Sequence, residues 1–317
     1  MSRLAIIFPG QGAQYPGMAR DMYDSFACSR TVFDQASLGL GRDVRKLCWE
    51  SDAATLAETA NAQPGILAAS AACLAPALEA GVQPTAYAGL SLGEYTALVA
   101  AGSIGLGEAM RLVSVRARLM QEAIPQGQGA MAAVIGLGRH EISQICSLSS
   151  RFGVVEAANY NAPDQIVISG HAAAVEAAAV AAKEAGARRV IPLAVSAPFH
   201  CSLLRSVEAE FAAALASASF DEPLLPVIAN TTARPVRQPA SIRWALTTQI
   251  SSPVMWQDSV EYLAAELGVD TFLEIGPGKV LSRFVNKIQP DALTLSIEDP
   301  RSLDAALAAL SERGLVQ

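Results

Sequence analysis

The sequence has little charge and no long apolar run. Only 17% of its 317 residues are charged and 51% are hydrophobic, so we expect a well-packed globular protein and not a disordered chain. No run of about 18 strongly apolar residues occurs. The apolar stretch near the N-terminus is too short for a secretory signal. These shortages predict a cytoplasmic protein that has no membrane partner.

Basic residues and cysteines are also scarce. The 23 basic residues are outnumbered by 30 acidic ones, which gives a net charge of -7, and the basic residues are dispersed. Nucleic acid is therefore excluded as a partner, because phosphate contacts need clustered Lys and Arg. The five cysteines are an odd number with no CxxC pair, so we expect reduced, mostly buried thiols.

Short apolar runs alternate with longer helical stretches along most of the chain. The expected strands lie at 3–8, 86–90, 226–230, 271–275 and 293–297, and the expected helices include 17–37, 61–80, 202–218 and 256–267. Such alternation predicts an α/β domain built on a largely parallel sheet.

The segment 127–195 has a different pattern. A strand is followed by a short helix at 139–150, two extended runs across the turn NAPD, a helix at 172–186 and a last strand. This βαββαβ order is typical of a ferredoxin-like unit. We therefore expect a large domain made of 1–126 and 196–317, with 127–195 inserted as a small domain.

A serine lies between two glycines at one strand-to-helix junction. In the stretch Gly89-Leu90-Ser91-Leu92-Gly93, the pattern Gly-x-Ser-x-Gly predicts a nucleophile elbow, a strained turn that needs small neighbours. The N–H of Leu92 is then placed to stabilise negative charge on an attacked carbonyl oxygen. The alternative is a tight turn that contains a serine by chance.

A catalytic serine needs a base, and the chain has only three histidines. His140 and His171 are expected to be exposed in the inserted unit, whereas His200 lies between a strand and a helix, where it can project into a cleft. His200 is therefore the candidate base, against the alternative of a structural histidine. Asp164 is the only aspartate between Ser91 and His200 and is a poor third member of a triad, because it lies in a turn of the small domain.

One arginine points inward on the helix after the elbow. At 100° per residue, Arg116 lies in the middle of an apolar face, and Arg111 and Arg118 point the opposite way. A buried arginine needs an anion. The anion is either an internal carboxylate or a substrate carboxylate held by two parallel hydrogen bonds.

The loop after the first strand contains Gly10-Gln11-Gly12. It lacks the third glycine of a dinucleotide fingerprint, because Tyr15 occupies that position. Such a loop can place a backbone N–H beside the elbow as a second oxyanion donor.

Six motifs in this order resemble the malonyl-CoA:acyl carrier protein transacylases. They are GQGAQ at 10–14, GLSLGEY at 89–95, RARLMQEA at 116–123, PFH at 198–200, QISSPVMWQDSV at 249–260 and EIGPGKVL at 274–281. The resemblance covers nearly the whole chain. It implies an α/β-hydrolase-like large domain with a ferredoxin-like insertion.

The resemblance implies a two-step acyl transfer. Ser91 would take the malonyl group from malonyl-CoA, and the phosphopantetheine thiol of an acyl carrier protein would then take it from the serine. His200 would act as base and then acid in each step, the N–H groups of Gln11 and Leu92 would form the oxyanion hole, and Arg116 would bind the malonyl carboxylate. Neither a metal nor a redox cofactor is needed, because a thioester is already activated. The enzyme is expected to be a monomer.

Four further positions are carried over from the resemblance alone. The main-chain carbonyl of Gln249 would orient the histidine, and Asn161 matches a motif residue on the substrate side. Phe199 stands where related polyketide acyltransferases with a bulky aromatic favour malonyl units. Leu90 departs from the family pattern, which commonly has histidine before the serine, and this leaves acyl selectivity open.

Three other functions remain open from the sequence. A serine hydrolase or thioesterase shares the elbow and the histidine, but does not need the inward arginine. A non-catalytic CoA-binding subunit would not need Ser91 and His200 together. A malonyl transferase could also belong to a malonate decarboxylase system instead of fatty-acid or polyketide synthesis.

Overall fold

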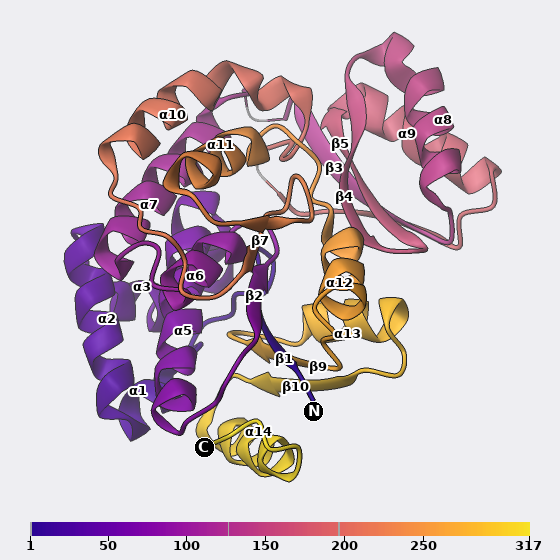
Figure 1. Ribbon diagram of the computed structural model, residues 1–317. Coiled ribbons are helices and arrows are strands. Elements are labelled where there is room, and N and C mark those ends of the chain that lie inside the picture. The colour runs from indigo at the N-terminus through magenta and orange to yellow at the C-terminus, as the bar shows by residue number, and fades with distance from the viewer. Residues whose placement is uncertain (1, 126, 196) are drawn as a thin grey trace.

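The computed structural model describes residues 2–125, 127–195 and 197–317, which form two sheets with helices packed against them (Figure 1). The larger sheet has six strands in the spatial order β10 (Leu293–Ile297), β9 (Thr271–Ile275), β1 (Leu4–Phe8), β2 (Ala86–Gly89), β7 (Val227–Ile228) and β8 (Pro235–Val236). The first five are parallel and correspond to the five predicted strands. The short antiparallel β8 was not predicted, because two residues carry no periodic pattern.

Strand β1 separates two apolar cores. All five of its residues are buried, as expected for the centre of a parallel sheet covered on both faces. Leu4, Ile6 and Phe8 point into one core, and Ala5 and Ile7 point into the other. The alternation fixes which helices pack on which face of the sheet.

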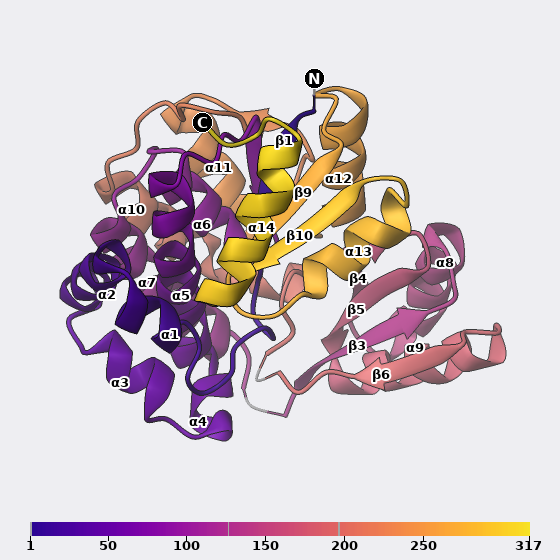
Figure 2. The ribbon, with the colours of Figure 1, turned by 90° about the horizontal axis from the view of Figure 1, so that it is seen from below.

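Helices cover both faces of the larger sheet (Figures 1 and 2). The core that contains Leu4 is shared with α2, α5, α7 and α14, and the core that contains Ala5 is shared with α12 and α13. The helices of this part are α1 (Arg20–Ser25), α2 (Ala27–Leu40), α3 (Val44–Trp49), α4 (Ala53–Ala57), α5 (Thr59–Glu79), α6 (Gly93–Ala100), α7 (Leu106–Glu122), η2 (Ser202–Val207), α10 (Glu208–Ser217), α11 (Pro239–Gln249), α12 (Trp256–Ala265), α13 (Val280–Ile288) and α14 (Pro300–Glu312). Among the described helices, none is long and apolar enough to cross a membrane. All five cysteines are free, and all except Cys28 are buried, as predicted.

The smaller sheet is antiparallel and has the order β4 (Val155–Ala162), β5 (Gln165–His171), β3 (Gly129–Ile135) and β6 (Arg189–Pro192). Its helices are α8 (Arg139–Ser149), the 3-10 turn η1 (Ser150–Phe152) and α9 (Ala172–Glu184), which share an apolar core with one face of the sheet. The chain order is βαββαβ, so the predicted ferredoxin-like unit is confirmed.

Val254 pairs with a strand of the smaller sheet. The N–H of Val254 donates to the carbonyl oxygen of Ala158 at 2.8 Å, and the N–H of Tyr160 donates to the carbonyl oxygen of Val254 at 2.9 Å. Val254 therefore forms a one-residue parallel bridge with Asn159 beside β4. We propose the domain division 1–126 with 196–317 and 127–195 on this arrangement; positions 126 and 196 themselves lie outside the described residues.

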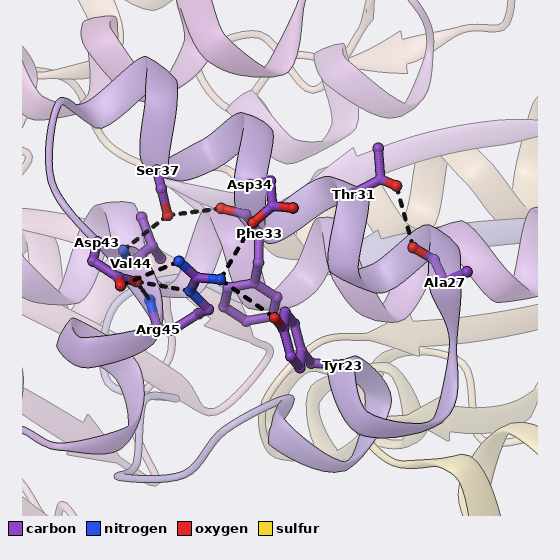
Figure 3. A network of polar contacts seen from close by, with 9 residues as sticks. All are labelled: Tyr23, Ala27, Thr31, Phe33, Asp34, Ser37, Asp43, Val44 and Arg45. Carbon is purple, nitrogen blue, oxygen red and sulfur yellow. Dashed lines mark hydrogen bonds and ion pairs between the residues drawn. The ribbon is translucent and has the colours of Figure 1, made fainter.

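Helices α1 to α3 are joined by a polar cluster around Arg45 (Figure 3). The Asp43 carboxylate caps α3 by accepting from the N–H of Arg45 at 2.9 Å, and it also accepts from Nε of the same residue at 2.9 Å. Nη1 of Arg45 reaches Asp34 and the Tyr23 hydroxyl, each at 3.3 Å. The cluster fixes a corner of the helical layer away from the elbow.

Candidate active site

The turn between β2 and α6 has no room for side chains at its two glycines. Ser91 has a φ of +53°, a conformation that is strained for a residue with a Cβ. A Cβ added to Gly89 would lie 2.0 Å from the backbone of Gly93, and one added to Gly93 would lie 2.2 Å from the carbonyl oxygen of Phe8. The turn is therefore a nucleophile elbow in shape, with the serine at its tip.

Ser91 and His200 lie in direct contact, although 109 positions separate them in the sequence. The Oγ of Ser91 is 2.7 Å from Nε2 of His200, and Nδ1 of His200 is 2.8 Å from the main-chain oxygen of Gln249. Because a carbonyl oxygen can only accept, Nδ1 carries the hydrogen and Nε2 is the acceptor for the serine hydroxyl. Asp164 takes no part in this chain, since it pairs with Arg188 and Lys287.

The imidazole of His200 is kept neutral. Burial and, to a lesser extent, the positive charge of Arg116 lower the pKa of His200 from 6.5 to about 3, against the opposing hydrogen bonds to the Gln249 and Ser252 backbone. A neutral ring with Nε2 as acceptor can take a proton from the serine hydroxyl. Of the other two histidines, His140 is exposed as predicted, but His171 is half-buried because its Nδ1 accepts the N–H of Val154.

Arg116 is fully buried and faces the serine. Its Nη2 donates to Ser91 Oγ at 3.0 Å and to Oε1 of Gln249 at 2.8 Å, and its Nη1 donates to Oε1 of Gln63 at 2.7 Å. The guanidinium lies over the Tyr95 ring, 5.5 Å from the centroid. Within the described part of the chain, Nε of Arg116 has no hydrogen-bond partner and no carboxylate lies within 4.0 Å of the guanidinium.

A buried carboxylate lies on the other side of Gln249. Oε2 of Glu94 accepts from Nε2 of Gln249 at 2.7 Å and from the N–H of Asn230 at 3.0 Å. Asn230 in turn accepts the N–H of Ser91 at 2.6 Å through Oδ1 and donates to the Gly89 carbonyl at 2.7 Å. Burial raises the pKa of Glu94 to about 7, against the two hydrogen bonds and the charge of Arg116.

A cavity of about 490 Å³ opens beside Ser91 and His200. Its lining includes Gln11, Leu90, Asn161 and Phe199, together with apolar side chains of the smaller sheet. Oδ1 of Asn161 is buried without a hydrogen-bond partner among the described residues. A ligand in this cavity would therefore meet an apolar wall with a few polar contacts, as is usual for binding sites.

The backbone N–H groups of Gln11 and Leu92 are uncommitted, since no hydrogen bond in the described part of the chain uses either. The loop that carries Gln11 lies directly against the elbow, because a Cβ on Gly10 would be 2.5 Å from the carbonyl oxygen of Leu90. The sequence-predicted residues Ser91, His200, Arg116 and Gln249 are in contact, and the other four lie around them. No group of three or more possible metal ligands occurs within 2–125, 127–195 and 197–317.

Three residues of this network were missed by the sequence analysis. Asn230 could have been found, because it ends a predicted strand and the carboxyl ends of neighbouring parallel strands meet at one edge of the sheet. Glu94 could also have been found, because it lies inside the GLSLGEY motif, directly after the elbow. Gln63 lies in α5 among small apolar residues and has no local signal.

A serine and a neutral histidine at the carboxyl edge of a parallel sheet define a class of enzymes that form serine esters. The family model of the acyl transferase domain matches residues 5–295. The chain is 42% identical to the malonyl CoA-acyl carrier protein transacylase of Bacillus subtilis strain 168 over 98% of both chains. It therefore belongs to the malonyl-CoA:acyl carrier protein transacylase family, as the six motifs predicted.

Solved structures agree with this membership. The crystal structure of an acyl carrier protein S-malonyltransferase from Vibrio cholerae O1 biovar eltor superimposes with a TM-score of 0.93 at 42% identity, over 96% of this chain and all of that one. The malonyl-transacylase in a complex with a type II polyketide synthase acyl carrier protein gives a TM-score of 0.94 at 40% identity, over 97% of this chain and all of that one. The predicted α/β fold with its separate smaller sheet is thus shared by both.

Proposed function

We propose that the protein transfers a malonyl group from malonyl-CoA to the phosphopantetheine thiol of an acyl carrier protein. The observation that carries the proposal is the buried guanidinium of Arg116, 3.0 Å from the Ser91 hydroxyl and without a carboxylate partner. A neutral acyl group would leave this charge unmatched, whereas the free carboxylate of a malonyl group would pair with it. The relatives are named for malonyl transfer, which supports the same conclusion.

The first half-reaction begins with proton transfer to Nε2 of His200 as Ser91 Oγ attacks the thioester carbonyl. The tetrahedral intermediate then collapses, the C–S bond breaks, and His200 returns the proton to the CoA sulfur. In the second half, His200 takes the proton of the carrier thiol, whose sulfur attacks the malonyl ester. The C–O bond breaks and the proton returns to Ser91 Oγ. The main-chain oxygen of Gln249 would hold the imidazole in the required tautomer throughout.

The remaining predicted residues would serve the bound acyl group. The uncommitted N–H groups of Gln11 and Leu92 would donate to the oxyanion in both halves. The unpaired Oδ1 of Asn161 would accept a hydrogen bond from an N–H of the pantetheine arm. Phe199, which lines the cavity together with Leu90, would limit the size of the acyl chain.

We also propose that the acidic carrier docks near the groove between β6 and α13. This groove has a volume of about 750 Å³, and its charged lining residues are Arg188, Arg189, Lys287 and Asp164. Asp164 pairs with Arg188 and Lys287, so the groove keeps a net positive charge on an otherwise acidic chain. The enzyme would work as a monomer in the cytoplasm on its two thioester substrates and without a metal or redox cofactor. Carrier proteins of fatty-acid synthesis, polyketide synthesis and malonate decarboxylase form the panel that would identify the natural acceptor.

Incubation with malonyl-CoA, with and without a carrier protein bearing phosphopantetheine, tests the proposal. We expect a malonyl adduct on Ser91 by intact mass, and malonyl-carrier as the product when the carrier is added. Release of free malonate at the same rate in both reactions would instead show a hydrolase. A protein without an adduct would be a binding subunit.

A further inference from the structure

Glu94 is a buried carboxylate that takes no part in the proposed chemistry. It lies at the second position of α6, is 1% exposed and sits behind the elbow. Burying a carboxylate is costly unless its oxygens are well hydrogen-bonded. Its carboxyl group accepts hydrogen bonds from the backbone of Asn230 and the side chain of Gln249, both of which contact Ser91. Burial of the Glu94 carboxylate therefore has a free-energy cost that packing alone does not explain.

The carboxyl group of Glu94 is one of three groups that together fix which way the Gln249 amide faces. Nε2 of Gln249 lies between two acceptors, Glu94 Oε2 at 2.7 Å and the main-chain oxygen of Ser91 at 3.0 Å. Oε1 of the same amide faces Nη2 of Arg116 at 2.8 Å. Turning the amide over would place an NH₂ group against the guanidinium and an oxygen against two other oxygens. Only one orientation satisfies every partner.

The orientation matters because Gln249 holds one side of Arg116. Nη2 of Arg116 has two hydrogen atoms, and its two acceptors are Gln249 Oε1 and Ser91 Oγ. Nη1 is held by Gln63, so the guanidinium is fixed between two glutamine oxygens and its Nε remains uncommitted. Loss of the Gln249 acceptor would leave Nη2 held by Ser91 Oγ alone and the guanidinium less firmly directed, because the Tyr95 ring beneath it restrains its plane but not its direction.

We propose that Glu94 is a positioning residue for carboxylate recognition, acting through the side chain of Gln249 on the direction of Arg116. This inference rests on the proposed function, in which Arg116 binds the malonyl carboxylate. In a low-dielectric network, hydrogen bonds in series strengthen one another, so the hydrogen bond that Glu94 accepts from Gln249 acts on Arg116 through a single amide. The His200 contact is separate, because it uses the main-chain oxygen of Gln249.

A double-mutant cycle tests the relay. We measure kcat/KM for malonyl-CoA and acetyl-CoA in Glu94→Ala, Gln249→Met and the double variant, all of which keep the main-chain oxygen at 249. Loss of the hydrogen bond between Glu94 and Gln249 is expected to lower the malonyl-to-acetyl ratio about tenfold in Glu94→Ala, mainly through KM for malonyl-CoA. The double variant should be no worse than Gln249→Met. Additive losses, or equal losses with both substrates, would overturn the proposal.

Two conservative variants keep the test decisive if Glu94→Ala does not fold. Glu94→Gln retains an oxygen that accepts from Asn230 and Gln249, so the ratio should stay within about threefold of wild type. Glu94→Asp keeps the charge but withdraws it by one methylene, so the ratio should fall as in the alanine variant. A normal ratio in Glu94→Asp, or a full loss in Glu94→Gln, would contradict a positioning role.

Arg116→Ala is measured alongside to separate the two proposals. If Arg116→Ala leaves the malonyl-to-acetyl ratio unchanged, the role of Arg116 in carboxylate binding is wrong and the relay falls with it. If Arg116→Ala lowers the ratio and Glu94→Ala and Glu94→Asp do not, only the relay is wrong. Melting temperatures of all variants exclude loss of folded protein as the cause.

Discussion

Two arginines of this protein, Arg116 and Arg45, each lie beside a tyrosine ring but have opposite surroundings. The Arg45 side chain is 33% exposed and forms ion pairs with Asp43 and Asp34 (Figure 3). Arg116 is fully buried, and its partners in the described chain are two glutamine oxygens and a serine hydroxyl. The charge of Arg45 is neutralised by the carboxylates that it contacts, while the hydrogen-bond partners of Arg116 are all neutral groups.

The difference separates a structural arginine from a binding one. Burial lowers the pKa of Arg116, which shows that the folded protein solvates its charge less well than water does. Hydrogen bonding with the Asp43 carboxylate raises the pKa of Arg45. A site that holds a cation with neutral acceptors and an unused N–H keeps its attraction for an incoming anion.

The largest effect is expected at the serine next to Arg116. Ser91→Ala removes the nucleophile and should lower malonyl transfer by a factor on the order of 10⁴ or more while the fold is kept. Intact mass after incubation with malonyl-CoA measures the adduct. An adduct of normal yield would disprove the assignment of Ser91.

His200→Ala should slow acylation by a factor on the order of 10² or more, the usual size of general-base catalysis. Stopped-flow measurement of CoA release from malonyl-CoA gives the rate. An unchanged rate would point to a different base, since His200 is the only histidine in contact with Ser91 in the described residues.

Arg116→Ala tests the comparison directly. Loss of a desolvated charge pair costs about 2–5 kcal/mol, so malonyl transfer should fall at least tenfold. Acetyl-CoA has no free carboxylate, and its use should stay constant or rise. The ratio of kcat/KM for the two substrates is measured in wild type and variant. An equal fall with both would make Arg116 a structural residue like Arg45.

Lowering the pH should destabilise the folded protein, because His200 is buried in its neutral form. Its pKa is about 3 in the folded protein and 6.5 in the unfolded chain, so between these values only the unfolded chain binds the proton. Stability therefore falls as pH drops below 6.5, and by pH 5 the contribution is about 2 kcal/mol. His200→Gln should lose less stability than wild type between pH 7 and 5 in urea unfolding. Parallel curves for the two proteins would show that His200 is charged when folded.

The smallest effect is expected at Arg45. Arg45→Ala removes partly exposed ion pairs, which are worth about 1 kcal/mol or less, and should leave both acyl substrates unaffected. Urea unfolding and the same kcat/KM assay provide the measurements. A change in the malonyl-to-acetyl ratio in Arg45→Ala would contradict the distinction between Arg45 as a structural arginine and Arg116 as a substrate-binding one.

The fold was predictable where the sequence has a regular pattern. The five parallel strands and the βαββαβ unit follow from apolar runs and their spacing, whereas β8 and the corner around Arg45 depend on contacts that no periodicity records. At the site, Ser91 could be predicted from the glycines on either side of it, and Arg116 from its place on the apolar face of a helix. The amide of Gln249 has no local signal, because its orientation depends on Glu94, Ser91 and Arg116, which lie 133 or more positions away in the sequence.

The two edge strands of the smaller sheet are both protected against pairing with another chain, which helps this protein to avoid aggregation. An open strand edge is a template on which another chain can add a strand. Val254 occupies part of the β4 edge with two backbone hydrogen bonds. The other edge, β6, is only four residues long and has exposed Arg189 at one end and exposed Pro192 at the other. Short length, charge and a missing N–H all oppose strand addition, so neither edge invites a second copy of the chain.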